Sequence, residues 1–149
     1  ICKESCAAMA DCSYLMLQSK EVDGSNRMAK LALIILEKLQ AKQYFSRVYA
    51  AIYGGVFCWC NNLKLSIPLL SQGYQEGMLI GDIESAFINV IGFLHNRFLV
   101  GDALAELGKD IDIYRKRMVE YGQVSSRAIT APLQQTVSKL IHFSGDQSS

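Results

Sequence analysis

The sequence is poor in proline and has little excess charge of either sign. Its 149 residues include two prolines, and 15 Lys and Arg side chains balance 14 Asp and Glu side chains to a formal net charge of +1. A near-neutral chain gives no electrostatic reason to expect nucleic acid or an anionic membrane as a partner. The scarcity of proline leaves room for long helices.

A membrane-spanning run and a disulfide framework are also missing. The longest run without a charged or strongly polar side chain, residues 48–60, has 13 residues, whereas a spanning helix needs about 20. We therefore expect a buried helix there and no membrane insertion. Five cysteines are an odd number, and no signal-peptide pattern precedes them, so we expect reduced thiols in a cytoplasmic protein.

The residues that are present indicate an all-α globular chain of about seven helices. Half of the residues are hydrophobic and 19% are charged, as in ordinary globular domains. Glycines and capping residues separate the expected helices, and the short connections make successive helices antiparallel neighbours. The expected helices cover residues 2–18, 26–39, 43–60, 66–81, 82–100, 102–121 and 126–142.

Most expected boundaries carry a start or stop signal. Polar side chains can accept a hydrogen bond from an unpaired backbone N–H, and proline is tolerated in a first turn. The start signals are Ser25 or Asn26 for the second helix, Ser66 with Pro68 for the fourth, Asp82 for the fifth and Asp102 for the sixth. Gly81, Gly101 and Gly122 are the matching stops. Pro132 either kinks the seventh helix or marks its start.

Apolar spacing predicts how these helices pack. The third helix is apolar nearly all round after Arg47 and should be the most buried element, and Gly54-Gly55 in its middle suggests the close approach of a neighbouring helix. A small-residue stripe on the fifth helix also suits close packing. The stripe is Ser85, Asn89, Gly92 and Asn96; the expected apolar faces are Leu104, Leu107, Ile111, Tyr114, Met118 and Tyr121 on the sixth helix, and Ile129, Leu133, Val137 and Leu140 on the seventh.

We expect one helical-repeat domain over residues 1–143, cut from a longer polypeptide, with a polar tail over residues 144–149. Helix pairs begin near Ser25, Ser66 and Asp102, and this spacing of about 36–41 residues is typical of helical repeats.

Several segments resemble a known repeat family. Residues 70–87 resemble a tetratricopeptide helix-turn-helix, with Ile-Gly-Asp at the turn and the small Ala86 early in the second helix. More narrowly, residues 47–54, 81–87 and 104–115 resemble a tetratricopeptide-like helical region of large multidomain signalling ATPases and hybrid sensor histidine kinases. The resemblance covers about residues 28–121. It implies an arm between an ATPase module and an output module, with no catalytic residue in this part.

The chain also departs from that family. The proline that usually separates tetratricopeptide repeats is absent after the fifth helix, and the second and third helices are unusually apolar.

Candidate chemistry is sparse. His95 lies on an expected helix and could in principle carry a phosphoryl group, but apolar neighbours and the lack of a supporting lysine favour a packed or surface histidine. Gly77 to Asp82 lacks the Gly-Lys-Ser/Thr ending of a nucleotide loop. The thiols could form a zinc site only if the ends of the first and third helices met, and none has the two-residue spacing of typical ligands. These thiols are Cys2, Cys6, Cys12, Cys58 and Cys60.

The sequence therefore predicts a non-enzymatic scaffold for protein–protein interaction and interdomain coupling in a larger signalling protein, with no cofactor or metal. Expected partners are a peptide, a flanking domain or a second copy of the chain. The two alternatives are a small-molecule sensor with an aromatic pocket around Trp59 and a phosphorelay domain using His95. If the first helix of each pair forms the inner surface, the partner-binding residues are Gln72, Gln75, Glu76, Lys109, Asp112 and Lys116.

Overall fold

The computed structural model describes residues 2–146, with side chains to Phe143, and this part of the chain is all-helical, which confirms the predicted fold class. The elements are α1 (Glu4–Gln18), α2 (Val22–Lys38), the 3₁₀ turn η1 (Lys42–Tyr44), α3 (Phe45–Tyr49), the π-helical segment η2 (Ala50–Val56), α4 (Phe57–Cys60), α5 (Leu63–Ile80), α6 (Ile83–Leu99), α7 (Leu104–Glu120) and α8 (Val124–Asp146).

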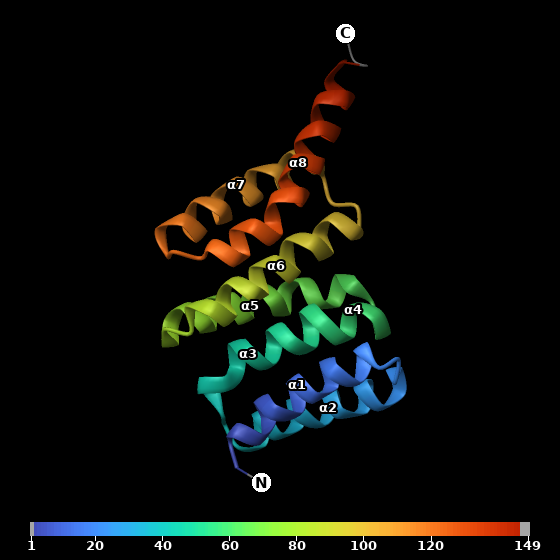
Figure 1. The fold of residues 1–149 in the computed structure, drawn as a ribbon, viewed down its shortest axis with the longest axis vertical. Coiled ribbons are helices and arrows are strands. Elements are labelled where there is room, and N and C mark those ends of the chain that lie inside the picture. The colour runs from blue at the N-terminus through green and yellow to red at the C-terminus, as the bar shows by residue number, and fades with distance from the viewer. Residues whose placement is uncertain (1, 147–149) are drawn as a thin grey trace.

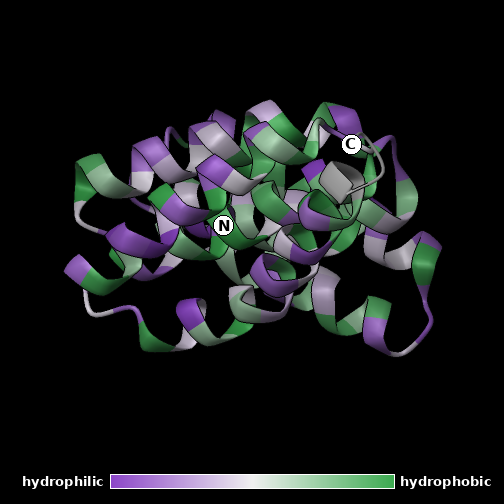
Figure 2. Cartoon of the chain, turned by 90° about the horizontal axis from the view of Figure 1, so that it is seen from above, coloured by the Kyte–Doolittle hydropathy of each residue, from purple (hydrophilic) through white to green (hydrophobic). Residues whose placement is uncertain are grey.

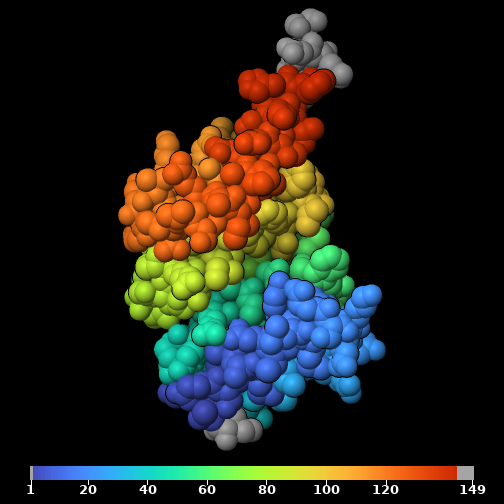
Figure 3. Space-filling view, viewed as in Figure 1, coloured from blue at the N-terminus to red at the C-terminus, as the bar shows by residue number. Residues whose placement is uncertain are grey.

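The helices stack in chain order along the long axis of the molecule (Figures 1 and 3). The pairs α1–α2, α5–α6 and α7–α8 form antiparallel hairpins, and α3, η2 and α4 together make one interrupted helix between the first two pairs. The last turns of α8 extend beyond the rest of the stack. Because each layer packs mainly on its neighbours, burial is shared along the stack.

Every second helix of the stack belongs to one row. Helix α1 packs on η2, η2 packs on α6, and α6 packs on α8. These four elements run in the same direction, because an antiparallel helix separates each from the next (Figure 1). Helices α2, α5 and α7 are the intervening elements.

Several predicted boundaries are confirmed and three are wrong. Gly81 ends α5 with a left-handed φ of 81°, and Asp82 caps α6 by accepting a hydrogen bond from the Ser85 backbone N–H at 3.3 Å. The second helix begins at Val22 instead of Asn26. The turn after α1 is made at Lys20, which adopts the left-handed conformation (φ 65°), so the chain is free to become helical four residues earlier than predicted.

Ser25 therefore lies inside α2, where its buried hydroxyl donates to the Ser13 carbonyl oxygen at 2.6 Å. The other two errors arise from side-chain hydrogen bonds. The Asn62 side chain accepts from the Lys64 N–H at 3.0 Å, so α5 starts at Leu63 and Pro68 lies within it. Asp102 accepts from the Arg97 guanidinium at 2.6 Å instead of capping α7.

The expected third helix is continuous in direction but not α-helical throughout. Its middle, residues 50–56, is π-helical and contains Gly54 and Gly55. Glycine has low helix propensity, so the α-helical hydrogen-bond pattern is weakest there. The expected third helix is well buried, with Val48 of α3 and Ile52 and Val56 of η2 fully enclosed, although α6 contains more buried residues.

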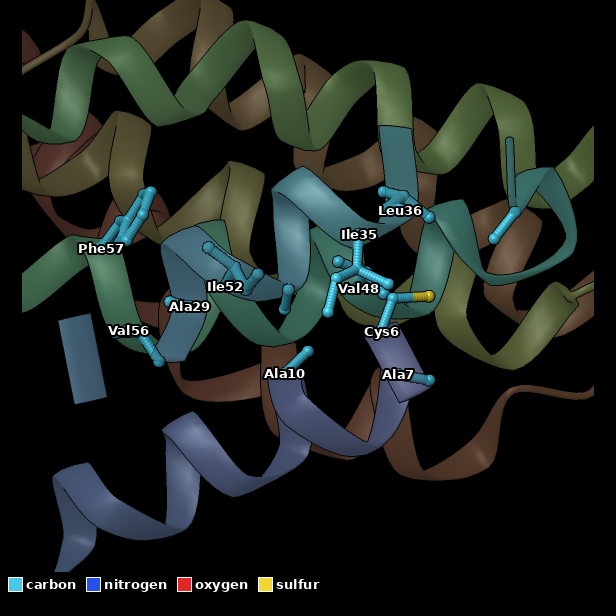
Figure 4. Close-up of a cluster of buried hydrophobic side chains, with 12 residues drawn as sticks. Cys6, Ala7, Ala10, Ala29, Ile35, Leu36, Val48, Ile52, Val56 and Phe57 are labelled. Carbon is cyan, nitrogen blue, oxygen red and sulfur yellow. The ribbon is translucent and has the colours of Figure 1, made fainter. Parts of the chain in front are cut away.

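Two apolar clusters form the core. The first gathers side chains from α1 through α4, including Ala10, Ile35 and Ile52 (Figure 4). The second joins α5 to α8 through Phe87, Ile111 and Val137. Hydrophobic and hydrophilic residues alternate along the helices in Figure 2, as this arrangement requires.

The expected faces of the last two helices are partly correct. Leu107, Ile111 and Met118 of α7 are fully buried, as predicted. Leu133 and Val137 of α8 are buried too, but Ile129 and Leu140 of the same predicted face are 54% and 41% exposed. Helix α8 packs on its partners through a narrower strip than the spacing predicts. It begins at Val124 and continues through Pro132 to Asp146, and residues 147–149 of the expected tail lie outside the described part.

Candidate functional site: a groove along the parallel row of helices

Of the three pockets described here, the one with the largest volume is a groove of about 1010 Å³. Helices α1, α3, η2 and α6 provide most of its lining, η1 and Asp82 contribute at one end, and Ile129 reaches it from α8. Among the described residues that line it, none belongs to α2, α5 or α7.

The groove is hollow because η2 presents small residues to it. Ala50, Ala51, Gly54 and Gly55 line the groove from this segment, and α6 adds Gly92. A Cβ atom at Gly92 would lie 3.2 Å from the Gly54 Cα atom, so these two glycines let η2 and α6 approach closely. The floor is therefore made largely of backbone and methyl groups.

Larger apolar side chains form the walls. Tyr14 and Leu15 come from α1, Ile88 from α6 and Ile129 from α8. They are 42%, 63%, 45% and 54% exposed, respectively, which leaves apolar area available to a partner. The Tyr14 ring lies against Gly55, where an added Cβ would be 2.7 Å from the ring, so a side chain at this position would displace the wall.

Charged groups gather beside the N-terminal end of α6. Arg47 donates a hydrogen bond to Asp11 at 2.6 Å across the α3–α1 boundary. This bond and the charge of Asp11 raise the pKa of the Arg47 guanidinium, and Asp82 and Glu84 act in the same direction. The four residues all line the groove, so three carboxylates accompany one guanidinium.

His95 and Asn96 line the other end of the groove. The His95 Nδ1 atom lies 2.8 Å from the Ile91 carbonyl oxygen, so its N–H donates to its own helix. Asn96 is 3% exposed, and its Nδ2 atom is buried without a hydrogen-bond partner. Among the described residues, no lysine or carboxylate hydrogen-bonds the His95 ring. The structure therefore adds no supporting residue to the phosphorelay hypothesis.

The six predicted partner-binding residues lie away from the groove. Gln72, Gln75 and Glu76 belong to α5, and Lys109, Asp112 and Lys116 belong to α7. Lys109 and Asp112 line a separate pocket of about 210 Å³ between α7 and α8, where Asp112 accepts a hydrogen bond from Gln134 at 2.7 Å. Helices α5 and α7 are the first helices of the hairpins α5–α6 and α7–α8, as the prediction assumed, but the groove lies on the other row, formed by α1, α3–η2, α6 and α8.

A sequence signal for the groove was present. Two adjacent pairs of small residues, Ala50-Ala51 and Gly54-Gly55, stand four residues apart in a segment otherwise rich in large apolar side chains. On a helix this spacing places them on one face, where they leave a hollow. The close helix packing predicted from the glycine pair is confirmed by the approach of Gly54 to Gly92.

The aromatic side chains form a hollow that does not include Trp59. Phe45, Tyr49 and Tyr53 contact one another in sequence, with ring centroids 3.9 Å and 4.8 Å apart, and line a pocket of about 430 Å³ against α2. Burial raises the pKa of Tyr53 to about 12, and the nearby Tyr49 adds to this shift. Trp59 is 77% exposed and lines none of the three pockets described here.

Over residues 2–143, whose side chains are described, no three His, Cys, Asp or Glu side chains are placed to share a metal ion. In the described part of the chain, no helix combines the length and apolarity needed to cross a bilayer. Comparison with protein-family models, curated proteins and solved structures finds no match. The groove and its lining residues are therefore the main evidence for function.

Proposed function

We propose that this chain is a non-catalytic, repeat-like helical module that holds a protein segment in the groove between α1, α3–η2 and α6. The segment comes from a flanking domain of the same polypeptide or from a separate partner. In this way the module couples other parts of a larger signalling protein. The observation that carries the proposal is the backbone-lined floor of η2 between exposed apolar walls.

The architecture supports a binding role for this surface. A row of parallel helices that pack on one another creates a continuous face, and the intervening helices hold that face rigid from behind. The same alternation of helices is expected from the resemblance to the tetratricopeptide-like arms of signalling ATPases and hybrid sensor kinases. Groove residues on rigid helices bind a partner without first paying for ordering of a loop.

The arrangement of side chains favours binding over catalysis. Arg47 is paired with Asp11, and the His95 N–H is paired with a backbone carbonyl of its own helix. A nucleophile next to a hydrogen-bonded base, as covalent catalysis requires, does not occur among the described groove residues. The walls offer hydrophobic area, which gives affinity for an apolar side chain of a partner.

The test uses a matched pair of isoleucines. Ile88 lies in the groove wall and is 45% exposed, and Ile113 lies on α7 outside the groove and is 48% exposed. A random peptide library is panned on the immobilised chain, and enriched peptides are synthesised for fluorescence anisotropy. We expect Ile88→Ser to weaken binding about five- to tenfold through lost apolar contact, and Ile113→Ser to leave it unchanged.

Circular dichroism checks that both variants keep their helical content. The proposal is wrong if no peptide is enriched, or if Ile113→Ser weakens the enriched peptides as much as Ile88→Ser does.

A further inference from the structure

In addition to its apolar walls, the groove carries an excess of negative charge at one end. Asp11, Asp82 and Glu84 line it together with Arg47, and these are its only Asp, Glu, Lys or Arg side chains among the described residues. Three carboxylates against one guanidinium leave two negative charges uncompensated. A partner that buries this region loses binding energy unless it brings positive charge.

Contacts within the protein explain the positions of only two of these three carboxylates. Asp11 is paired with Arg47, and Asp82 caps α6. Glu84 is exposed and, within the described residues, makes no hydrogen bond or ion pair. Its position in the first turn of α6 favours the helix dipole, as does that of Glu106 in α7, but Glu106 lies outside the groove. Glu84 is therefore the charged groove residue most available to a partner.

The charged and apolar parts of the groove lie at successive positions along the row. Asp82 and Glu84 stand at the start of α6, Ile88 follows one turn later, and Ile91 one turn after that. Tyr14 and Leu15 of α1 lie beside the apolar end, because Tyr14 contacts Gly55 and η2 runs parallel to α6. A bound segment thus meets carboxylates at one end and hydrophobic walls along the middle, before His95 and Asn96.

We infer that the occupant of the groove is a basic amphipathic protein segment, with Lys or Arg side chains beside the carboxylates of Asp11, Asp82 and Glu84 and apolar side chains between Leu15 and Ile88. This inference rests on the proposed function and specifies the chemistry of its partner. Charge complementarity selects this occupant over an acidic segment, which would place like charges in contact.

Two synthetic peptides of equal length test the inference. They share the same leucine positions, and the remaining positions are Lys in one peptide and Glu in the other. Fluorescence anisotropy measures their binding to the complete chain. We expect the Lys peptide to bind with an affinity that falls as NaCl rises from about 50 to about 300 mM, since salt screens exposed charges. We expect the Glu peptide to bind at least about tenfold more weakly.

Glu84→Gln removes one charge while keeping the shape of the side chain. We expect it to weaken the Lys peptide about two- to fivefold, the range of an exposed ion pair. Glu106→Gln is the matched control, because it removes the same charge from the first turn of α7, and it should leave binding unchanged. Thermal denaturation of both variants shows whether their stabilities differ.

The failures of the two proposals are distinguishable. If the Glu peptide binds as tightly as the Lys peptide and Ile88→Ser weakens both, the groove binds protein segments but the inferred charge preference is wrong. If Glu84→Gln and Glu106→Gln have equal effects on the Lys peptide, the charge inference is also wrong. If neither peptide binds and panning yields none that Ile88→Ser weakens, the proposed function itself fails.

Discussion

Asn89 is the residue that most directly joins the two halves of the core. It is fully buried on α6, and its Nδ2 atom donates to the Ser46 carbonyl oxygen at 2.9 Å and to the Ser85 carbonyl oxygen at 2.9 Å. The bond to Ser46 crosses from the second apolar cluster to α3 of the first. A buried amide without these partners would be strongly unfavourable, so the contact also fixes the register of α6 on α3.

Replacing Asn89 with alanine removes these bonds and leaves a cavity at the boundary. We expect Asn89→Ala to lower the free energy of unfolding by about 1–3 kcal/mol. Urea denaturation of Asn89→Ala, Ser46→Ala and the double variant measures the coupling between the two side chains. The cycle reports on the Asn89 Nδ2 hydrogen bond to the Ser46 hydroxyl oxygen at 3.2 Å, because Ser46→Ala keeps the backbone carbonyl. Effects of the single substitutions that simply add would show that this side-chain bond contributes nothing specific.

Among the elements, small residues allow α5 and α6 to pack closely on each other and on α3. A Cβ atom at Gly77 of α5 would lie 2.9 Å from the Ala86 Cβ atom and would collide with the Ser46 hydroxyl. Ala86 and Ser46 are themselves fully buried, so neither can move without disturbing the packing around it. The close contact of these helices thus depends on glycine at this position.

This packing reverses the usual effect of a helical glycine. Alanine normally stabilises a helix interior by up to about 1 kcal/mol relative to glycine. We expect Gly77→Ala to destabilise the protein by about 1–3 kcal/mol, because the added methyl group overpacks the α3–α5–α6 contact.

Gly108→Ala on α7 is the control. Its Cβ would meet the terminal methyl of Ile141 at 3.2 Å and make an ordinary van der Waals contact with Val137 at 3.6 Å. We expect a change near zero or a small gain in melting temperature for Gly108→Ala. A Gly77→Ala protein at least as stable as the parent would contradict this account of the packing.

For the whole molecule, the fold class and the approximate positions of most helices could be predicted from the sequence. Apolar spacing and the glycine stops located seven helical segments, and Gly81-Asp82 placed one turn correctly at residue resolution. Local signals sufficed there because a left-handed glycine and a capping aspartate pair the free backbone groups at the two helix ends without help from distant residues. Asp102 carried the same signal, but an ion pair with Arg97, five residues earlier at the end of α6, took its carboxylate.

The position of the candidate site could not be predicted from those local signals. The spacing of the helices does not decide whether the α1–α3–α6 row or the row with α5 and α7 carries a groove, because that depends on how side chains from several helices pack together. The π-helical geometry of η2 was equally hidden, since its glycines also suit an ordinary helix contact. The cluster of Asp11, Arg47, Asp82 and Glu84 joins residues that are distant in the sequence, so it becomes visible only in the folded chain.

The central claim is that the α1, α3–η2 and α6 face is the binding surface of the molecule. A two-dimensional ¹H–¹⁵N NMR titration of the chain with the Lys peptide tests it most directly. The account predicts that the largest shift changes occur at the amides of Gly54, Gly55 and Gly92, which line the groove. Changes concentrated instead on α5 and α7, around Gln72, Gln75 and Lys109, would contradict it.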